Sequence, residues 1–222
     1  MLVSEDSKRY RLWTPKQPLN ISRLARTVSL ADMLSWPKPS TEARLKLGVK
    51  LASSVMQLHE TEWLNERWRK CDIFFIQEEV NPRQRPVLEY PFLHREFTTF
   101  AAEAIPQAQT SFIVRCNKSL FSLGIVLIEL CFWQSLESLR ATHGQQADIG
   151  TTETVDYIIA CRLIDSRAVH EEAGSKYDDA VRRCIIGLDH RETQLDNDDF
   201  KNEVYHRVVK LLEENLQMFY NG

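Results

Sequence analysis

The feature that most constrains the fold is an apolar run, LFSLGIVLIELCFW, at positions 120–133. Drawn as a helix, the run is apolar around nearly its whole circumference, and helices of that kind are buried on most sides. It is too short to span a bilayer, and Glu129 interrupts it. We therefore predict a central buried helix that begins at Ser119 within a helical stretch reaching about Arg140.

The distribution of proline indicates that the second half of the chain is helical. All eight prolines lie at or before Pro106, so nothing in the rest of the chain interrupts helices in this way. Apolar spacing predicts helices at about 152–164, 176–187 and 198–219, with Asp196 or Asn197 capping the last. An apolar stripe along that last helix is expected to face the core: Phe200, Val204, Val208, Leu211, Leu212 and Phe219.

The first half of the chain mixes helix and strand signals. Ser29, with Asp32 three residues later, is a plausible start for a short helix at 30–35. Ser40 or Thr41 can cap a longer helix that ends near His59. The segment CDIFFI reads as a buried strand, and ISRLARTV as a short one. Loops, with room for one short strand, are expected over 77–118. The predicted class is mainly α with one or two short strands.

Composition excludes several functional classes. The 222 residues carry 28 basic and 31 acidic side chains, a net charge of −3, which argues against a nucleic-acid partner. One short run of basic and aromatic residues, KRYRLWTPK at 8–16, could bind single-stranded nucleic acid, but it is weak evidence on a slightly acidic chain. Neither GxGxxG nor GxxxxGK[ST] occurs, so dinucleotide and P-loop motifs are absent.

Cysteine use and the N-terminal sequence indicate an intracellular protein. The chain has five cysteines and no CxxC, and Cys131, Cys161 and Cys184 fall in apolar helical patterns. We expect buried thiols there and neither metal nor cofactor. The N-terminal sequence MLVSEDSKRY lacks the apolar core of a signal peptide. A cytoplasmic location without membrane attachment of this domain is therefore expected.

Three segments, in order, resemble the C-terminal lobe of a protein kinase. VSLADMLSW and STEARLKLGVKLASSVMQLHE look like the helix after the hinge and the long helix ending in Leu-His. ERWRKCDIFFI looks like a catalytic loop and its strand, and SLFSLGIVLIEL like the buried central helix. YDDAVRRCI and the final helix resemble the last two helices of the lobe. The resemblance implies a kinase-lobe-like domain over 25–222, without the N-terminal lobe, preceded by an extension at 1–24.

A closer resemblance is to a fungal domain family of unknown function built on this lobe. The phrases LASSVMQLHETEWL, RWRKCDIFF and SLGIVLIELCF carry it. Domains of that family often follow an N-terminal helical domain of the kind linked to prion propagation and heterokaryon incompatibility. This resemblance implies a protein partner or an upstream domain of the same polypeptide.

The residues needed for phosphoryl transfer are missing from the matching positions. The resemblance places Asp72 where kinases have a metal-binding Asn, and Arg67 where they have the catalytic Asp. A cation at that position cannot accept a hydroxyl proton. No Asp occurs in 73–147, so a DFG motif is impossible there, and Ser119 replaces the Asp that begins the central helix.

Other residues near the catalytic-like loop were weighed as sites. Asp72 is the best candidate for a relic metal ligand, although capping or pairing with Arg67 or Arg69 is the simpler interpretation. His59 fits a helix end better than a catalytic base. Weaker readings are magnesium binding by Glu60, Glu62, Glu66, Glu78 and Glu79, and nucleophilic chemistry by Cys71 or Cys116 with His59 or His94.

Three tryptophans near the rim of the kinase-like lobe, Trp36, Trp63 and Trp68, are candidates for an interaction surface. Partial burial under loops is the equally ordinary alternative. The sequence therefore favours a non-catalytic interaction or regulatory module. The alternative is a divergent phosphotransferase fragment that needs a separate ATP-binding lobe. A membrane-disrupting effector is a weaker third hypothesis.

Overall fold

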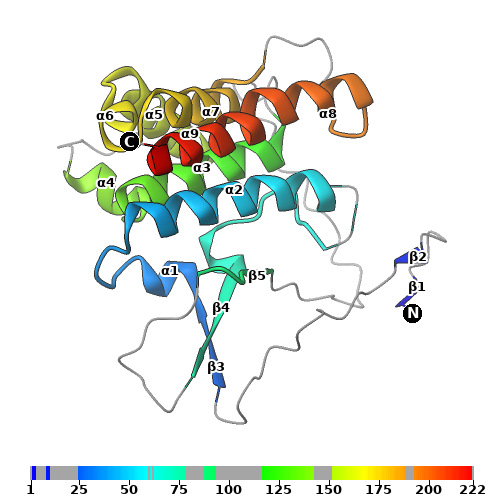
Figure 1. Cartoon of the computed structure of the whole chain (residues 1–222), viewed down its shortest axis with the longest axis horizontal. Helices are drawn as coiled ribbons and strands as arrows, with labels where there is room; N and C mark the ends of the chain where they lie inside the picture. The colour runs from blue at the N-terminus through cyan, green and yellow to red at the C-terminus, as the bar shows by residue number, and fades with distance from the viewer. Residues whose placement is uncertain are drawn as a thin grey trace.

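The structure is a computed structural model that describes residues 2–3, 9–10, 25–59, 61, 63–78, 88–93, 117–142, 152–188 and 193–221. Figure 1 shows long helices packed beside one another, with a small sheet below them. In chain order the elements are β1 (Leu2–Val3), β2 (Arg9–Tyr10), β3 (Ala25–Ser29), α1 (Leu30–Met33), α2 (Thr41–Leu58), the 3-10 turn η1 (Lys70–Asp72), β4 (Ile73–Glu78), β5 (Phe92–Leu93), α3 (Lys118–Phe132), α4 (Leu136–Thr142), α5 (Thr152–Asp165), α6 (Ala168–Ala173), α7 (Ser175–Ile186), α8 (Asp198–Val204), the π-helical turn η2 (Tyr205–Val209) and α9 (Lys210–Asn221).

Helix α3 is the centre of the molecule, as the apolar run predicts. Every residue from Ser119 to Cys131 is buried, and α2 and α7 pack against α3. Two glycines allow close approach, because a Cβ at Gly48 would lie 3.1 Å from Leu127 Cδ2 and one at Gly124 would lie 2.9 Å from Cys184 Cβ. The hydrophobic core therefore forms around this helix.

Arg44 of α2 and an unusual backbone conformation end α3. Trp133 has a φ of 55°, in the left-handed region, and its N–H closes the last turn on the Glu129 carbonyl. The buried Arg44 guanidinium donates to the Leu130 carbonyl at 3.1 Å and to the Cys131 carbonyl. Helix ends leave such carbonyls without partners inside the helix, so a long-range side chain satisfies them here.

Local capping fixes the helix starts. Ser29 and Asp32 form a reciprocal capping box at α1. Ser40, Asn117 and Asn197 accept backbone N–H groups at the starts of α2, α3 and α8. The predicted caps at Ser29, Ser40 and Asn197 are thus confirmed.

A three-stranded antiparallel sheet, in the order β3-β4-β5, lies beneath the helices (Figure 1). Val28 pairs with Phe75, and Ile73 pairs with Leu93. Alternate side chains of β4 are buried, including Ile73 and Phe75. The prediction of one or two strands was too low, since β1 and β2 also pair with each other. Two-residue strands carry too little periodicity to be found in a sequence.

The last predicted helix is interrupted. The π-helical turn η2 separates α8 from α9. A π turn adds one residue to a helical turn, which rotates the stripe that follows. Phe200, Val204, Val208 and Leu212 are buried as predicted, but Phe219 is 47% exposed. Helix α6 was not predicted at all.

Candidate functional site

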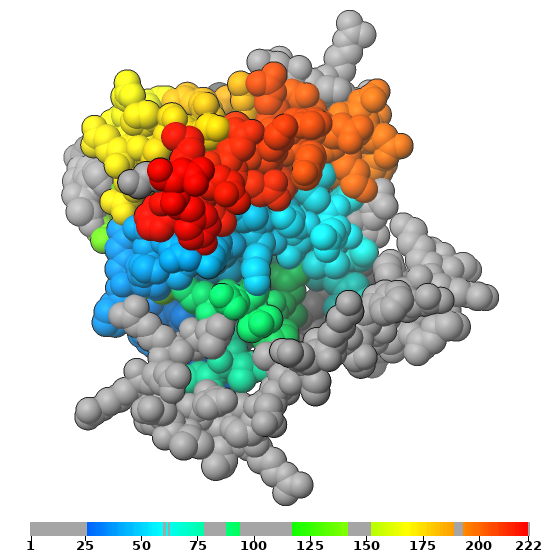
Figure 2. All heavy atoms as spheres, viewed as in Figure 1, coloured from blue at the N-terminus to red at the C-terminus, as the bar shows by residue number. Residues whose placement is uncertain are grey.

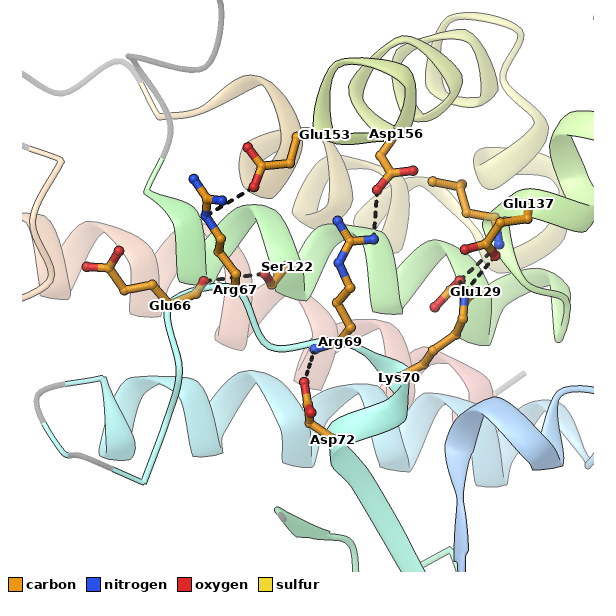
Figure 3. Close-up of polar contacts among 11 residues, drawn as sticks. Glu66, Arg67, Arg69, Lys70, Asp72, Ser122, Glu129, Glu137, Glu153 and Asp156 are labelled. Carbon is orange, nitrogen blue, oxygen red and sulfur yellow. Dashed lines mark hydrogen bonds and ion pairs between the residues drawn. The ribbon is translucent and has the colours of Figure 1, made fainter. Parts of the chain in front are cut away.

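A cleft lies where the loop 66–72 crosses α3, with α4 and α5 supplying the far wall (Figure 3). It contains a cavity of about 30 Å³, room for one or two water molecules. Apolar side chains of α3 and the buried Trp68 line it together with charged groups. The loop carries Arg67 and Asp72, the two residues that the sequence led us to expect in a catalytic-like loop.

Two arginines of the loop reach across the cleft to α5. Arg67 Nε lies 3.1 Å from Glu153 Oε1, and Arg69 Nη1 lies 2.9 Å from Asp156 Oδ2 (Figure 3). Asp156 is buried, and burial raises the pKa of its carboxyl, against the opposing effect of the Arg69 charge. Arg67 is half exposed, so its pair contributes little to stability.

Lys70 forms the most buried polar contact of the cleft. Its Nζ lies 2.5 Å from Glu129 Oε1 and 2.7 Å from Glu137 Oε2, and the Leu136 N–H donates to Glu129 at 2.9 Å. Burial raises the pKa of Glu129, which is 1% exposed, although Lys70 and the Leu136 amide oppose it. Burial would lower the pKa of Lys70, but the two carboxylates hold it above its usual value.

Asp72 acts as a local cap. Its Oδ2 accepts the backbone N–H of Arg69 at 2.8 Å (Figure 3). This confirms the capping interpretation, since the carboxylate faces the start of the 3-10 turn that it closes. Glu66 pairs with Lys118 at 2.8 Å, and its main-chain oxygen accepts from Ser122 Oγ at 3.4 Å.

The three candidate tryptophans do not share one surface. Trp68 is 2% exposed and belongs to the core beside the cleft, so it offers no exposed surface. Trp36 is half-buried and lines a separate groove beside α2. Trp63 is half-buried in the turn that follows α2. Spacing in the sequence could not separate these positions, because burial depends on which helices cover each loop.

The weaker candidates are also dispersed. His59 caps the end of α2, where its Nδ1 lies 2.9 Å from the Met56 carbonyl oxygen. Cys71 is an exposed residue, but partial desolvation of its thiol, together with the Asp72 charge, raises the pKa of that thiol. The structure does not describe the side chains of the remaining candidates, which are Glu60, Glu62, Glu78, Glu79, His94, Cys116 and the segment 8–16.

Sequence reasoning missed the acidic side of the cleft. Glu129, Glu137, Glu153 and Asp156 come from three helices and lie 59 to 87 residues from their basic partners. One signal was available: Glu129 is a lone charge inside a run that must be buried, and buried charges require a partner. The partner itself, Lys70, is fixed by tertiary packing.

The part of the chain that the structure describes holds neither a membrane-spanning helix nor a grouped set of metal ligands. None of the described helices is both long and apolar enough to cross a membrane. Within the same residues, no three His, Cys, Asp or Glu side chains are grouped so that they could hold one metal ion.

Comparison with known proteins identifies the family. No curated protein and no solved structure matches the chain. A family model described as "Domain of unknown function (DUF7580)" matches residues 1–219, nearly the whole length. The chain therefore belongs to this family of domains of unknown function.

Proposed function

We propose that this chain is a non-catalytic interaction module on a kinase-lobe-like scaffold. The observation that carries the proposal is the ion pair of Arg67 with Glu153. The kinase resemblance places Arg67 where a catalytic aspartate would stand, and a paired guanidinium cannot act as a general base.

The rest of the loop supports the same reading. Lys70 and Arg69 engage the buried carboxylates Glu129 and Asp156. Breaking such a pair leaves an uncompensated buried charge, which is strongly unfavourable. The four groups therefore hold the loop against α3 and α5, and a substrate would have to displace them.

The resemblance extends the proposal to the protein's setting. We propose a fungal, cytoplasmic protein in which this domain engages a protein partner or an upstream domain of the same polypeptide. The phrases LASSVMQLHETEWL and SLGIVLIELCF support this.

The test is a thermal-shift titration of the purified chain with ATP, with and without magnesium. A ligand at 100 times its dissociation constant stabilises a protein by about 2.7 kcal/mol. We expect no change in the unfolding midpoint up to roughly millimolar ATP. A magnesium-dependent rise would overturn the proposal.

The alternative, a phosphotransferase fragment that needs a separate ATP-binding lobe, draws on the raised pKa values of Glu129 and Asp156 at the cleft. Carboxyl groups with shifted pKa values occur at catalytic sites as well as in structural ion pairs. Asp72→Asn tests it, because the amide oxygen keeps the cap to the Arg69 N–H. Phosphate transfer by the intact protein that is lost in Asp72→Asn, with folding unchanged, would favour the alternative.

A further inference from the structure

A second hollow, larger than the cleft, runs beside α2. We call it the α2 groove and define it by Met33, Trp36, Ala43, Lys50, Leu88 and Trp133. Its volume is about 360 Å³, within the range of binding sites for ligands and side chains. Pro37 and Pro39 add to the apolar wall.

The floor of the groove is rigid. Met33 and Trp133 are 2% and 3% exposed, so packing fixes them. The Trp133 indole N–H donates to the Trp36 carbonyl at 3.1 Å, which ties the 34–40 turn to the end of α3. A preformed apolar floor of this kind loses little conformational freedom when a partner binds.

Exposed tyrosines contact two lysines that line the groove. Tyr90 lies under the Lys50 ammonium, 5.3 Å from Nζ to the ring centroid. Tyr220 lies under Lys46 at 5.7 Å and donates to Glu42 Oε1 at 2.9 Å. Exposed aromatic side chains of this kind are enriched at protein interfaces.

The C-terminal end of α9 exposes further apolar side chains on the opposite side of α2 from the 88–93 segment. Met218 and Phe219, 56% and 47% exposed, neighbour Tyr220 in the chain. Figure 2 shows the end of α9, in red, against α2, in blue, and residues of the 88–93 segment, in green, on the other side of α2. Apolar and aromatic side chains are therefore exposed on both sides of α2.

Charge gives the surface a preference. Lys46 is paired with Glu42 at 2.7 Å. Lys50 contacts the Tyr90 ring and the main-chain oxygen of Glu89, and among the described residues no carboxylate forms an ion pair with it. Glu89 also lines the groove, with an exposed side chain, but it is the main-chain oxygen of Glu89 that contacts Lys50. A carboxylate that reaches this ammonium would gain a charge-assisted contact beside the apolar floor.

We propose that the α2 groove binds a short segment of a partner protein that carries one or two large apolar side chains next to a carboxylate. The apolar groups lie against the half-buried Trp36 and Leu88, above the buried floor, and the carboxylate meets Lys50. This inference rests on the proposed function, because it names the chemistry of the partner that a non-catalytic module would bind.

The first experiment selects random peptides displayed on phage against the purified chain. We expect the enriched peptides to share large apolar residues beside Asp or Glu. Ala43→Arg places a long cation into the groove and should weaken these peptides at least about tenfold in fluorescence polarisation. Ile186→Ser, at an exposed apolar residue that does not line the groove, is the matched control and should leave their binding unchanged.

The second experiment reverses the charge. Lys50→Glu should weaken the acidic peptides and favour the same peptides with Asp or Glu replaced by Lys. Lys50 is exposed, so this variant should fold even if Ala43→Arg does not, and its unfolding midpoint checks that. The groove assignment is overturned if no peptide is enriched, if Ala43→Arg binds equally well, or if Lys50→Glu keeps the acidic preference.

The outcomes separate this inference from the proposed function. A magnesium-dependent ATP shift would overturn the non-catalytic proposal but would leave a groove that selects acidic peptides in place. A groove without selective binding, in a chain that also ignores ATP, would overturn only the groove.

Discussion

Gly124 is the position where a single methyl group should separate two central helices. A Cβ there would lie 2.7 Å from Ile185 Cδ1, 2.9 Å from Cys184 Cβ and 3.0 Å from Ile185 Cγ1. Carbon atoms pack best at about 3.5–4.0 Å. The Cys184 Cβ is bonded directly to the backbone of α7 and cannot rotate away, so α3 and α7 must move apart.

The size of the effect follows from two opposing contributions. Overpacking a core costs about 1–3 kcal/mol, and a clash that moves a backbone belongs near the upper end. Replacing glycine by alanine inside a helix returns about 1 kcal/mol. We expect Gly124→Ala to lower the free energy of unfolding by about 2 kcal/mol, measured by urea denaturation.

Gly48→Ala is the matched control on α2. Its Cβ would meet the flexible end of Leu127 at 3.1 Å, with Tyr177 Oη next at 3.7 Å. We expect a change within about 1 kcal/mol, because helix propensity offsets a small adjustment. Ile185→Val, which removes Cδ1, should cost less in the Gly124→Ala background than in the wild type. A Gly124→Ala protein as stable as the wild type would refute the packing argument.

Three further outcomes follow from buried groups. Arg44→Met removes the hydrogen bonds to the end of α3 and should lower the free energy of unfolding, measured by urea denaturation, by about 3 kcal/mol, since each charge-assisted bond is worth about 1.5–3 kcal/mol. Arg44→Lys should have an intermediate effect. A loss below about 0.5 kcal/mol for Arg44→Met would contradict this role. At about pH 8 a maleimide should modify the exposed Cys71 well before the buried Cys131, because burial raises the pKa of Cys131 to about 12 and leaves almost no thiolate. Equal modification rates of the two cysteines, followed by peptide mass mapping, would refute this. Burial raises the folded-state pKa of Glu129 above its usual value of 4.5. The wild-type protein therefore loses stability as pH rises from 4.5 through that raised pKa, because the carboxyl ionises less readily in the folded state than in the unfolded state. Glu129→Gln, in which Lys70 keeps its second carboxylate, lacks this titration, so the difference in stability between wild type and variant should shift in favour of the variant as pH rises above 4.5. Urea midpoints whose difference does not vary with pH would contradict the assignment.

Sequence patterns located the helices well where the signals were local. The capping box joins Ser29 and Asp32, three positions apart, and Ser40 caps its helix through the N–H of Ala43. The buried helix α3 follows from composition alone, because no other environment suits an apolar circumference. The paired two-residue strands β1 and β2 and the π turn η2 were not predicted, since neither leaves a periodic pattern long enough to read.

The candidate site was predicted only in part. The sequence pointed to the loop around Asp72 and to the capping role of that residue. It did not indicate that Arg69 meets Asp156, 87 residues away, or that Trp68 is buried while Trp36 lines a groove. Such pairs depend on how α5 and α3 lie against the loop.

The sequence by itself therefore determined a mainly helical fold, the starts of α1, α2 and α8, and the buried centre, because each depends on residues within a turn or two of one another. Only the tertiary structure decided which carboxylates meet the basic loop, how closely α3 approaches α7, and where exposed tyrosines and Lys50 flank an apolar groove. Those features join segments that are distant in the chain, and the packing of α2, α3 and α7 sets their geometry.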